Sequence, residues 1–371
     1  MRLCFLATGD SVHSYRWIRF FADRGHETHW LSLTDCAYPP HERIHFERLG
    51  RGKGRTLELA GQALRIRKIV RSIRPDIVHA HYAGSYGLLG LIAGVRPFVV
   101  TAWGSDILVA GKQWGKSSLI RAVLSHADLI TCDAHHIAEA IRRLGAAPEK
   151  IQIVHFGVET DRFFPGSADQ EIVSRWAVEN RPVVISLRQL EPIYDIETLL
   201  KAMPLVARAC PAVHCIIASS GSLEQTLRAS AAAKGLNGHV QFIGRYANAE
   251  LPRMLRCAQV YVSTSLSDAG IAASTAEAMA CGLPVVVTNT GENDRWITDG
   301  ETGFLVKSGD SQALAERIIG LLNDAALRES MGKRARRTIE TRNGYVQEME
   351  KMQRYYIQLA SQAAAVGGNA L

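Results

Sequence analysis

The chain has 371 residues, 47% of them hydrophobic and 21% charged, and a formal net charge of +7. This length and composition are typical of a soluble globular protein with two domains, each large enough for its own core. The stretch nearest to a membrane span, 87–103, is interrupted by Arg96 and Pro97, which argues against a transmembrane helix.

In the first half of the chain, short apolar runs alternate with amphipathic segments. The apolar runs predict strands at 2–7, 28–33, 77–80, 97–101, 129–132 and 151–154. The amphipathic segments predict helices at 14–24, 57–73, 86–93 and 134–144.

The second half repeats this scheme. Its predicted strands are 183–187, 213–219, 240–242, 260–263, 284–288 and 303–306, and its predicted helices are 196–209, 223–234, 249–256, 273–281, 311–323 and 326–341. Alternation of strands and helices predicts parallel sheets with helices on both faces. We therefore expect an α/β protein with two Rossmann-like parallel-sheet domains that face each other across a cleft.

A turn-rich segment at 163–169 follows the last strand of the first half and marks the domain boundary. We expect an N-terminal domain at 1–165 and a C-terminal domain at 170–342. Beyond them, a long amphipathic helix at 345–361 is expected to pack back toward the N-terminal domain. The small residues of 363–371 are expected to form a mobile tail.

The seven cysteines are irregularly spaced and form no CxxC pair. This pattern predicts reduced thiols in a cytoplasmic protein and argues against a zinc site. Because the sequence also contains no Asp-x-Asp motif, we expect no cofactor and no essential divalent metal.

Ten lysines and arginines lie between Arg43 and Arg74, against Glu47 and Glu58. One reading of this basic segment is a solvated helix face. Another is attraction to an anionic membrane surface or a lipid-phosphate acceptor, which leaves peripheral binding at the inner membrane face open. Nucleic-acid binding is the weakest reading, because no aromatic interleaving accompanies the charge, and we expect no nucleic-acid partner.

The stretch 267–287 carries the clearest signal for a ligand. A turn at Gly270 leads into a helical segment with Glu277 on its early turns, and an apolar strand follows. The free N–H groups and positive end of a helix receive phosphate oxygens, and a carboxylate accepts hydrogen bonds from hydroxyls. The stretch therefore predicts a site for a phosphorylated sugar.

Further motifs are spread over nearly the whole chain. They are RGHE at 24–27, DIVHAH at 76–81, VVTAWGSD at 99–106, KIQIVHFGV at 150–158 with Phe163 and Pro165, SLRQL at 186–190, Gly221, FIG at 242–244, and DGETGFL at 299–305. In this order and spacing, together with 267–287, they resemble glycosyltransferase family 4, the retaining enzymes of the GT-B fold. The resemblance implies an N-terminal acceptor-binding domain and a C-terminal nucleotide-sugar-binding domain.

The resemblance also implies roles for individual residues. Arg188 matches the arginine that neutralises the donor diphosphate, and Glu277 matches the glutamate that holds the ribose hydroxyls; these two are the expected catalytic residues. The other expected donor-site residues, which contact the base, the diphosphate or the sugar, are Tyr194, Gly221, Gly244, Arg245, Tyr246, Asp268, Gly270, Ile271 and Ala272. In the family mechanism the leaving diphosphate takes the acceptor proton on the same face of the sugar, so catalysis depends on positioning and charge stabilisation.

Three positions depart from the family pattern. Ala269 stands where a first glutamate grips the sugar, and Asp268, one residue earlier, supplies a carboxylate only if the loop is reshaped. Tyr194 replaces a phosphate-binding lysine, and Trp103 replaces a histidine. A tyrosine donates one hydrogen bond to phosphate but carries no charge, and a tryptophan accepts no proton.

Acceptor-side candidates follow the strands of the first half, since open parallel sheets bind ligands at the carboxyl ends of their strands. They are Gly9, His13, His81, Trp103 and Asp106. A helix-capping role is the alternative for Asp106. For the histidines, and above all for His79, the alternative is a hydrogen-bonded side chain in the packing of the sheet.

The favoured function is a retaining glycosyltransferase that moves a sugar from a nucleotide-diphosphate sugar to a hydroxyl of a saccharide or lipid-linked acceptor, in polysaccharide or glycolipid assembly. One alternative is a sugar-nucleotide epimerase of the same fold. The other is a weakened or non-catalytic relative, suggested by Tyr194, Trp103 and Ala269.

Overall fold

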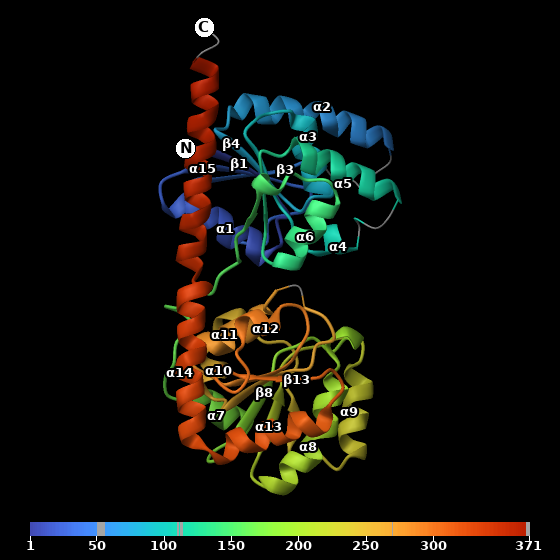
Figure 1. Cartoon of the computed structure of the whole chain (residues 1–371), viewed down its shortest axis with the longest axis vertical. Helices are drawn as coiled ribbons and strands as arrows, with labels where there is room; N and C mark the ends of the chain where they lie inside the picture. Colours follow the sequence, from blue (N-terminus) through green and yellow to red (C-terminus); the bar gives the residue numbers. More distant parts are fainter. Residues whose placement is uncertain (50–55, 110, 112–113, 269, 369–371) are drawn as a thin grey trace. The chain divides into compact units, whose positions relative to one another are not determined.

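The computed structural model describes residues 1–49, 56–109, 111, 114–268 and 270–368, which form two parallel β-sheets flanked by helices (Figure 1). The chain divides into two compact units, one made of Met1–Phe156 with Val346–Leu371 and the other of Gly157–Tyr345. The predicted α/β architecture with two Rossmann-like parallel sheets is confirmed.

The N-terminal unit is built on a seven-stranded sheet with the strand order β3-β2-β1-β4-β5-β6-β7. Its strands are β1 (Arg2–Leu6), β2 (Glu27–Ser32), β3 (Ile44–Arg48), β4 (Ile77–His81), β5 (Phe98–Thr101), β6 (Leu129–Cys132) and β7 (Ile151–Ile153). Its helices are α1 (Val12–Asp23), α2 (Thr56–Ile73), α3 (Ser85–Ala93), α4 (Ser105–Leu108), α5 (Trp114–His126), α6 (His135–Arg143) and most of α15 (Tyr345–Gly368).

The C-terminal unit is built on a six-stranded sheet with the order β10-β9-β8-β11-β12-β13. Its strands are β8 (Val183–Ser186), β9 (His214–Ile217), β10 (Val240–Phe242), β11 (Val260–Ser263), β12 (Val285–Thr288) and β13 (Phe304–Val306). Its helices are α7 (Gln170–Trp176), α8 (Ile196–Ala209), α9 (Glu224–Ala233), α10 (Leu251–Arg256), α11 (Ala273–Ala280), α12 (Asn293–Trp296), α13 (Ser311–Asn323) and α14 (Ala325–Arg342).

The central strands β8 and β11 of the C-terminal unit are buried on both faces, and successive side chains of each strand point to opposite sides. Ile185 and Tyr261 belong to one core, with residues of α7, α10 and α11. Val184 and Val262 belong to the other core, with residues of α8 and α13. Burial on both faces explains why these strands read as unbroken apolar runs in the sequence.

In each sheet the strand order reverses between two central strands, β1 and β4 in one unit and β8 and β11 in the other. The carboxyl ends of such a strand pair form the crevice where open α/β sheets bind ligands. Gly9 follows β1 and His81 ends β4, while Arg188 follows β8 and Asp268 follows β11. The fold therefore brings predicted site residues to the reversal point of each sheet.

The boundary between the units falls after Phe156. Residues 157–165, which the sequence assigns to the first domain, belong to the C-terminal unit. Val158 forms an isolated parallel bridge with Gly344, and Phe163 lies in the core of that unit.

The end of the chain differs from the expected mobile tail. Helix α15 continues beyond 361 to Gly368, and only 369–371 lie outside the described residues. The run of alanines at 363–365 favours helix, since alanine has the highest helix propensity. Within the N-terminal unit the helix is anchored by Tyr356, which is fully buried and shares a hydrogen bond with His79 Nδ1.

All seven cysteines carry free thiols. None of the helices in the described part of the chain combines the length and the apolar character that crossing a membrane requires.

Candidate active site

Arg188 lies at the centre of a polar cluster in the C-terminal unit. Its Nε donates a hydrogen bond to Ser265 Oγ at 3.0 Å, and its Nη2 donates one to Asp268 Oδ1 at 2.5 Å. The side chain is only 12% exposed. Neither of these bonds uses Nη1, so within the described part of the chain its two N–H groups remain for an anionic ligand such as a phosphate.

Asp268 forms an ion pair with Arg188, and its side chain is only 6% exposed. Burial raises the pKa of Asp268, and the neighbouring positive charge of Arg188 opposes this shift. The second carboxylate oxygen, Oδ2, is buried and has no hydrogen-bond partner among the described residues. A buried carboxylate oxygen without a partner is costly, so its position suits a hydroxyl group of a ligand.

Tyr194 supports Arg188 through its ring, whereas the sequence predicts a contribution through its hydroxyl. The guanidinium carbon lies 4.4 Å from the ring centroid, a cation–π contact. The backbone carbonyl of Tyr194 accepts a hydrogen bond from Thr264 Oγ1 at 3.0 Å, which fixes the 3₁₀ turn Pro192–Tyr194 to the loop after β11.

The loop that carries Asp268 is held from behind by the segment after β12. Thr288 Oγ1 and Thr290 Oγ1 both donate to the carbonyl of Ser265, at 2.5 and 3.2 Å. Gly291 has φ +61°, and a Cβ added there would lie 2.3 Å from the carbonyl oxygen of Asp268. Only glycine fits such a position, so the backbone sets the place of the Asp268 carboxylate.

Helix α11 begins immediately after Gly270, Ile271 and Ala272, as the glycine turn predicts. Its first turn contains no acidic residue, so no side-chain charge in that turn neutralises the positive helix end. Ala269, where the family has its first glutamate, lies outside the described residues.

Glu277 and Tyr246 lie near each other beside the expected base loop. Burial raises the pKa of Tyr246, and the negative charge of Glu277 raises it further. Gly244 precedes this tyrosine with φ +73°. Arg245 and Tyr246 line a cavity of about 290 Å³, close to the lower size limit of small-molecule pockets.

Gly221 lies against the backbone of the loop that carries Arg188. A Cβ at this position would lie 2.4 Å from the carbonyl oxygen of Leu190. Next to it, Ser220 Oγ accepts a hydrogen bond from Arg245 Nε at 2.7 Å. Gly221 thus lets two loops of the site pack closely, and it offers no side chain to a ligand.

His81, which is buried, and His13, which is half-buried, belong to one aromatic cluster in the N-terminal unit. His81 packs edge-on against Trp17, with 5.2 Å between ring centroids, and neither of its ring nitrogens has a partner among the described residues. His13 lies 4.6 Å from the ring of Phe156, which in turn contacts Trp103. Burial lowers the pKa of His81 to about 3 and that of His13 to about 4, so both are neutral at pH 7.

Asp106 and Gly9 have structural roles. Asp106 Oδ2 accepts a hydrogen bond from the amide of Ala83 at 2.6 Å, and Oδ1 accepts one from the amide of Trp103 at 3.0 Å. The carboxylate therefore joins the loops after β4 and β5. Gly9 packs so closely on the next loop that a Cβ would lie 2.4 Å from Asp35 O.

His79 is a hydrogen-bonded core residue, which is the alternative weighed for it. Its Nε2 lies 2.7 Å from Thr101 Oγ1, and its Nδ1 contacts the hydroxyl of Tyr356. The partners are side chains of β5 and α15, so His79 connects the sheet to the C-terminal helix.

The lowered pKa values of His13 and His81 predict a loss of stability in mild acid. In the unfolded chain they take up protons near pH 6.5, whereas in the fold His13 and His81 stay neutral until about pH 4 and about pH 3. The unfolded state therefore binds more protons in this window. The free energy of unfolding should fall, from pH 6.5 toward 4, by up to about 1.4 kcal/mol per pH unit for each histidine.

Urea unfolding at several pH values measures this slope. His81→Leu should reduce the pH dependence of the free energy of unfolding by the contribution of one histidine. His135→Asn, at an exposed histidine, should leave this pH dependence unchanged. An unchanged slope in His81→Leu would show that this imidazole is not held neutral.

Two family models match the chain. The model described as glycosyl transferases group 1 matches residues 169–338, and the model described as glycosyl transferase 4-like matches residues 2–134. With the two parallel-sheet units, these matches define a glycosyltransferase of the GT-B fold. The chain belongs to glycosyltransferase family 4 and is an enzyme that transfers a sugar from a nucleotide sugar.

Similar proteins include N-acetyl-alpha-D-glucosaminyl L-malate synthase of Bacillus anthracis, 24% identical over 86% of this chain and 85% of the relative. Another is the GDP-mannose-dependent alpha-(1-6)-phosphatidylinositol monomannoside mannosyltransferase of Mycolicibacterium smegmatis, 27% identical over 73% of each chain. The fold is shared with HepE of Anabaena, solved in complex with UDP, at a TM-score of 0.82 and 20% identity, over 96% of this chain and 99% of that one.

Proposed function

We propose that the protein is a retaining glycosyltransferase that uses a nucleotide-diphosphate sugar, with Arg188 neutralising the charge that develops on the leaving diphosphate. The observation that carries the proposal is the cluster at the reversal point of the C-terminal sheet. There, Ser265, Asp268 and Tyr194 hold Arg188 and leave its Nη1 group for a phosphate.

In the proposed reaction the bond between the anomeric carbon of the sugar and the diphosphate oxygen breaks, and its electron pair stays on that oxygen. The acceptor hydroxyl oxygen bonds to the same carbon on the same face. Its proton moves to the leaving phosphate oxygen, so no side chain has to act as a base. Arg188 and the amide groups at the start of α11 stabilise the negative charge, a contribution that is usually the largest in such sites.

Glu277 is proposed to accept hydrogen bonds from the ribose hydroxyls, beside the loop of Gly244, Arg245 and Tyr246. The proximity of Glu277 and Tyr246 supports this arrangement. Asp268 is proposed to take the place of the missing glutamate by accepting a donor-sugar hydroxyl on Oδ2.

We propose a lipid-linked or saccharide acceptor, presented at an anionic membrane surface. In the basic segment 43–74, residues 50–55 lie outside the described part of the chain, and Arg48 and Arg65 pair with Asp35 and Glu47. Arg67, Lys68 and Arg71 are exposed on α2 and are available to lipid phosphates. The mannosyltransferase relative is named for a phosphatidylinositol mannoside, which supports this acceptor class.

A mass-spectrometric screen of nucleotide sugars tests the proposed function. We expect one donor to release its nucleoside diphosphate, faster when a polyprenyl or inositol lipid acceptor is present in anionic vesicles. The rate should survive a chelator, because no metal takes part in the proposed step. An isomerised donor, no turnover of any donor, or strict dependence on a divalent ion would contradict the proposal.

A further inference from the structure

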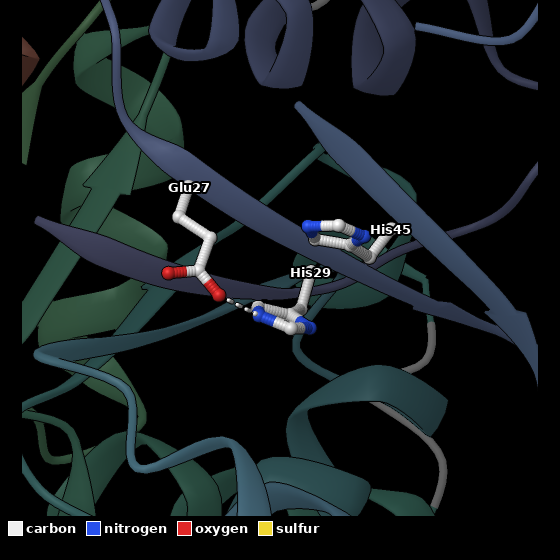
Figure 2. A group of neighbouring side chains, drawn as sticks. All are labelled: Glu27, His29 and His45. Carbon is white, nitrogen blue, oxygen red and sulfur yellow. Dashed lines mark hydrogen bonds and ion pairs between the residues drawn. The ribbon is translucent and has the colours of Figure 1, made fainter. Parts of the chain in front are cut away.

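Three side chains with metal-ligating atoms gather on one face of β2 and β3, at the edge of the N-terminal sheet. They are Glu27, His29 and His45, and their ligand atoms all lie within 4.8 Å of one another. Figure 2 shows the carboxylate of Glu27 beside the ring of His29, with the ring of His45 next to it on the neighbouring strand.

The parallel pairing of the two strands produces this arrangement. His29 and His45 are register partners, so their side chains leave the sheet side by side, with ring centroids 4.9 Å apart. Glu27 lies two residues before His29 and therefore points to the same face. The ligand set comes from backbone geometry at two adjacent strands.

We propose that Glu27, His29 and His45 form a binding site for a divalent first-row transition ion such as Zn²⁺. Two imidazole nitrogens and one carboxylate oxygen are a ligand set that suits these ions, with water completing the coordination. Bond lengths of about 2.0–2.1 Å require ligand atoms about 3.3 Å apart. His45 is exposed and the Glu27 side chain is 44% exposed, so side-chain rotations close the remaining gap.

The neighbouring contacts are compatible with a bound ion. Glu27 Oε1 lies 3.0 Å from His29 Nε2, and the ion replaces this contact. Glu27 Oε2 accepts a hydrogen bond from Arg2 Nε at 3.0 Å, and Arg2 is itself held by the carbonyl of Ile73. Arg2 can therefore keep its bond to Oε2 and orient the carboxylate while Oε1 binds the ion, as outer hydrogen bonds commonly do for metal ligands.

The ion has a structural role at this position. Among the described strands, β3 lies at the edge of the sheet and pairs with β2. An ion shared by His45 on β3 and by Glu27 and His29 on β2 ties the edge strand to its neighbour. Binding to the folded state alone then raises stability with ion concentration. The reaction proposed above for the other site has no step that uses such an ion.

Calorimetric titration of the full chain, stripped with a chelator, with ZnCl₂ tests the proposal. We expect one ion per chain, a melting temperature that rises with zinc concentration, and visible absorption bands after substitution with Co²⁺. His45→Asn should weaken zinc binding by at least about tenfold and remove the bands, because losing a ligand costs more than losing an outer contact. Glu27→Gln should also weaken binding.

His135→Asn, which removes an exposed histidine outside the cluster, is the matched control and should bind as the unmodified chain does. Equal far-UV circular dichroism of the stripped variants checks that they fold. The proposal is overturned if zinc fails to bind, or if the His45 and Glu27 variants bind it as tightly as the control.

Discussion

Replacing Arg188 with alanine is expected to lower kcat for sugar transfer by about 10²–10³-fold, the usual effect of removing one group that stabilises transition-state charge. The affinity for free nucleoside diphosphate should fall less, because the base and ribose contacts do not involve this side chain. Nucleotide release gives kcat, and calorimetric titration with nucleoside diphosphate gives the dissociation constant.

The experiment must separate the chemical role of Arg188 from its structural role. Removing it leaves Asp268 buried without its partner, which typically costs about 3–5 kcal/mol of stability. The double variant Arg188→Ala with Asp268→Asn removes the unpaired charge, so it should recover most of this stability and none of the activity. Arg228→Ala removes a half-exposed arginine bonded to Glu224 in the same unit. It should change neither the stability nor the transfer activity. Transfer by Arg188→Ala at the unmodified rate would refute the assignment.

The sequence predicts strands best where both faces of the sheet are buried. The runs at 129–132 and 260–263 match the fully buried strands β6 and β11 residue for residue, since burial on both sides favours apolar residues. The edge strand β3 is absent from the prediction. Its residues are half-buried or exposed, and Ile44–Arg48 contains no apolar run.

Helices α5 and α7 are also absent from the prediction. Helix α7 has only seven residues, with Ile172 and Trp176 buried, which is too short for a periodic pattern to stand out. Asp169 caps it by accepting a hydrogen bond from the amide of Ile172. That cap lies inside the turn-rich segment that the sequence assigns to the domain boundary.

The reversal point of the C-terminal sheet was within reach of sequence reasoning, because motif order and strand order together bring Arg188 and Asp268 to neighbouring strand ends. The side-chain contacts around Arg188 and Asp268 could not be predicted from the sequence. Ser265 has no motif of its own, and its role depends on the distance from Arg188 that folding creates. Tyr194 looks like the loss of a cation in the sequence, whereas in the fold its ring supports the remaining one.

The acceptor-side candidates show a second limit of prediction from the sequence. Asp106 has the residue type and the position of a group that could contact an acceptor, but both of its oxygens accept hydrogen bonds from backbone amides. This structural role of Asp106 cannot be predicted from the sequence, because it depends on two loops that meet only after folding. His81 is the opposite case, because its ring nitrogens have no partner within the described part of the chain.

Asp268→Asn is expected to lower kcat/KM for the sugar donor by about 10–100-fold, the cost of about 1.5–3 kcal/mol for a hydrogen bond to a charged group. The asparagine oxygen can still accept the bond from Arg188. Its NH₂ group then stands where Oδ2 would accept the sugar hydroxyl, so that contact is lost. Steady-state kinetics with the donor identified by the screen gives kcat/KM. Asp324→Asn, at a helix N-cap where asparagine serves as well as aspartate, is the matched control.

The affinities for the complete donor and for nucleoside diphosphate alone decide what Asp268 does. If Oδ2 binds the sugar, Asp268→Asn weakens binding of the sugar nucleotide and leaves the nucleoside diphosphate equal or tighter, because Arg188 has lost its counter-ion. If Asp268 only neutralises Arg188 until the donor arrives, both ligands bind more tightly by the same factor and kcat/KM rises. The ratio of the two dissociation constants changes only in the first case, so it tests the sugar contact independently of the charge at Arg188.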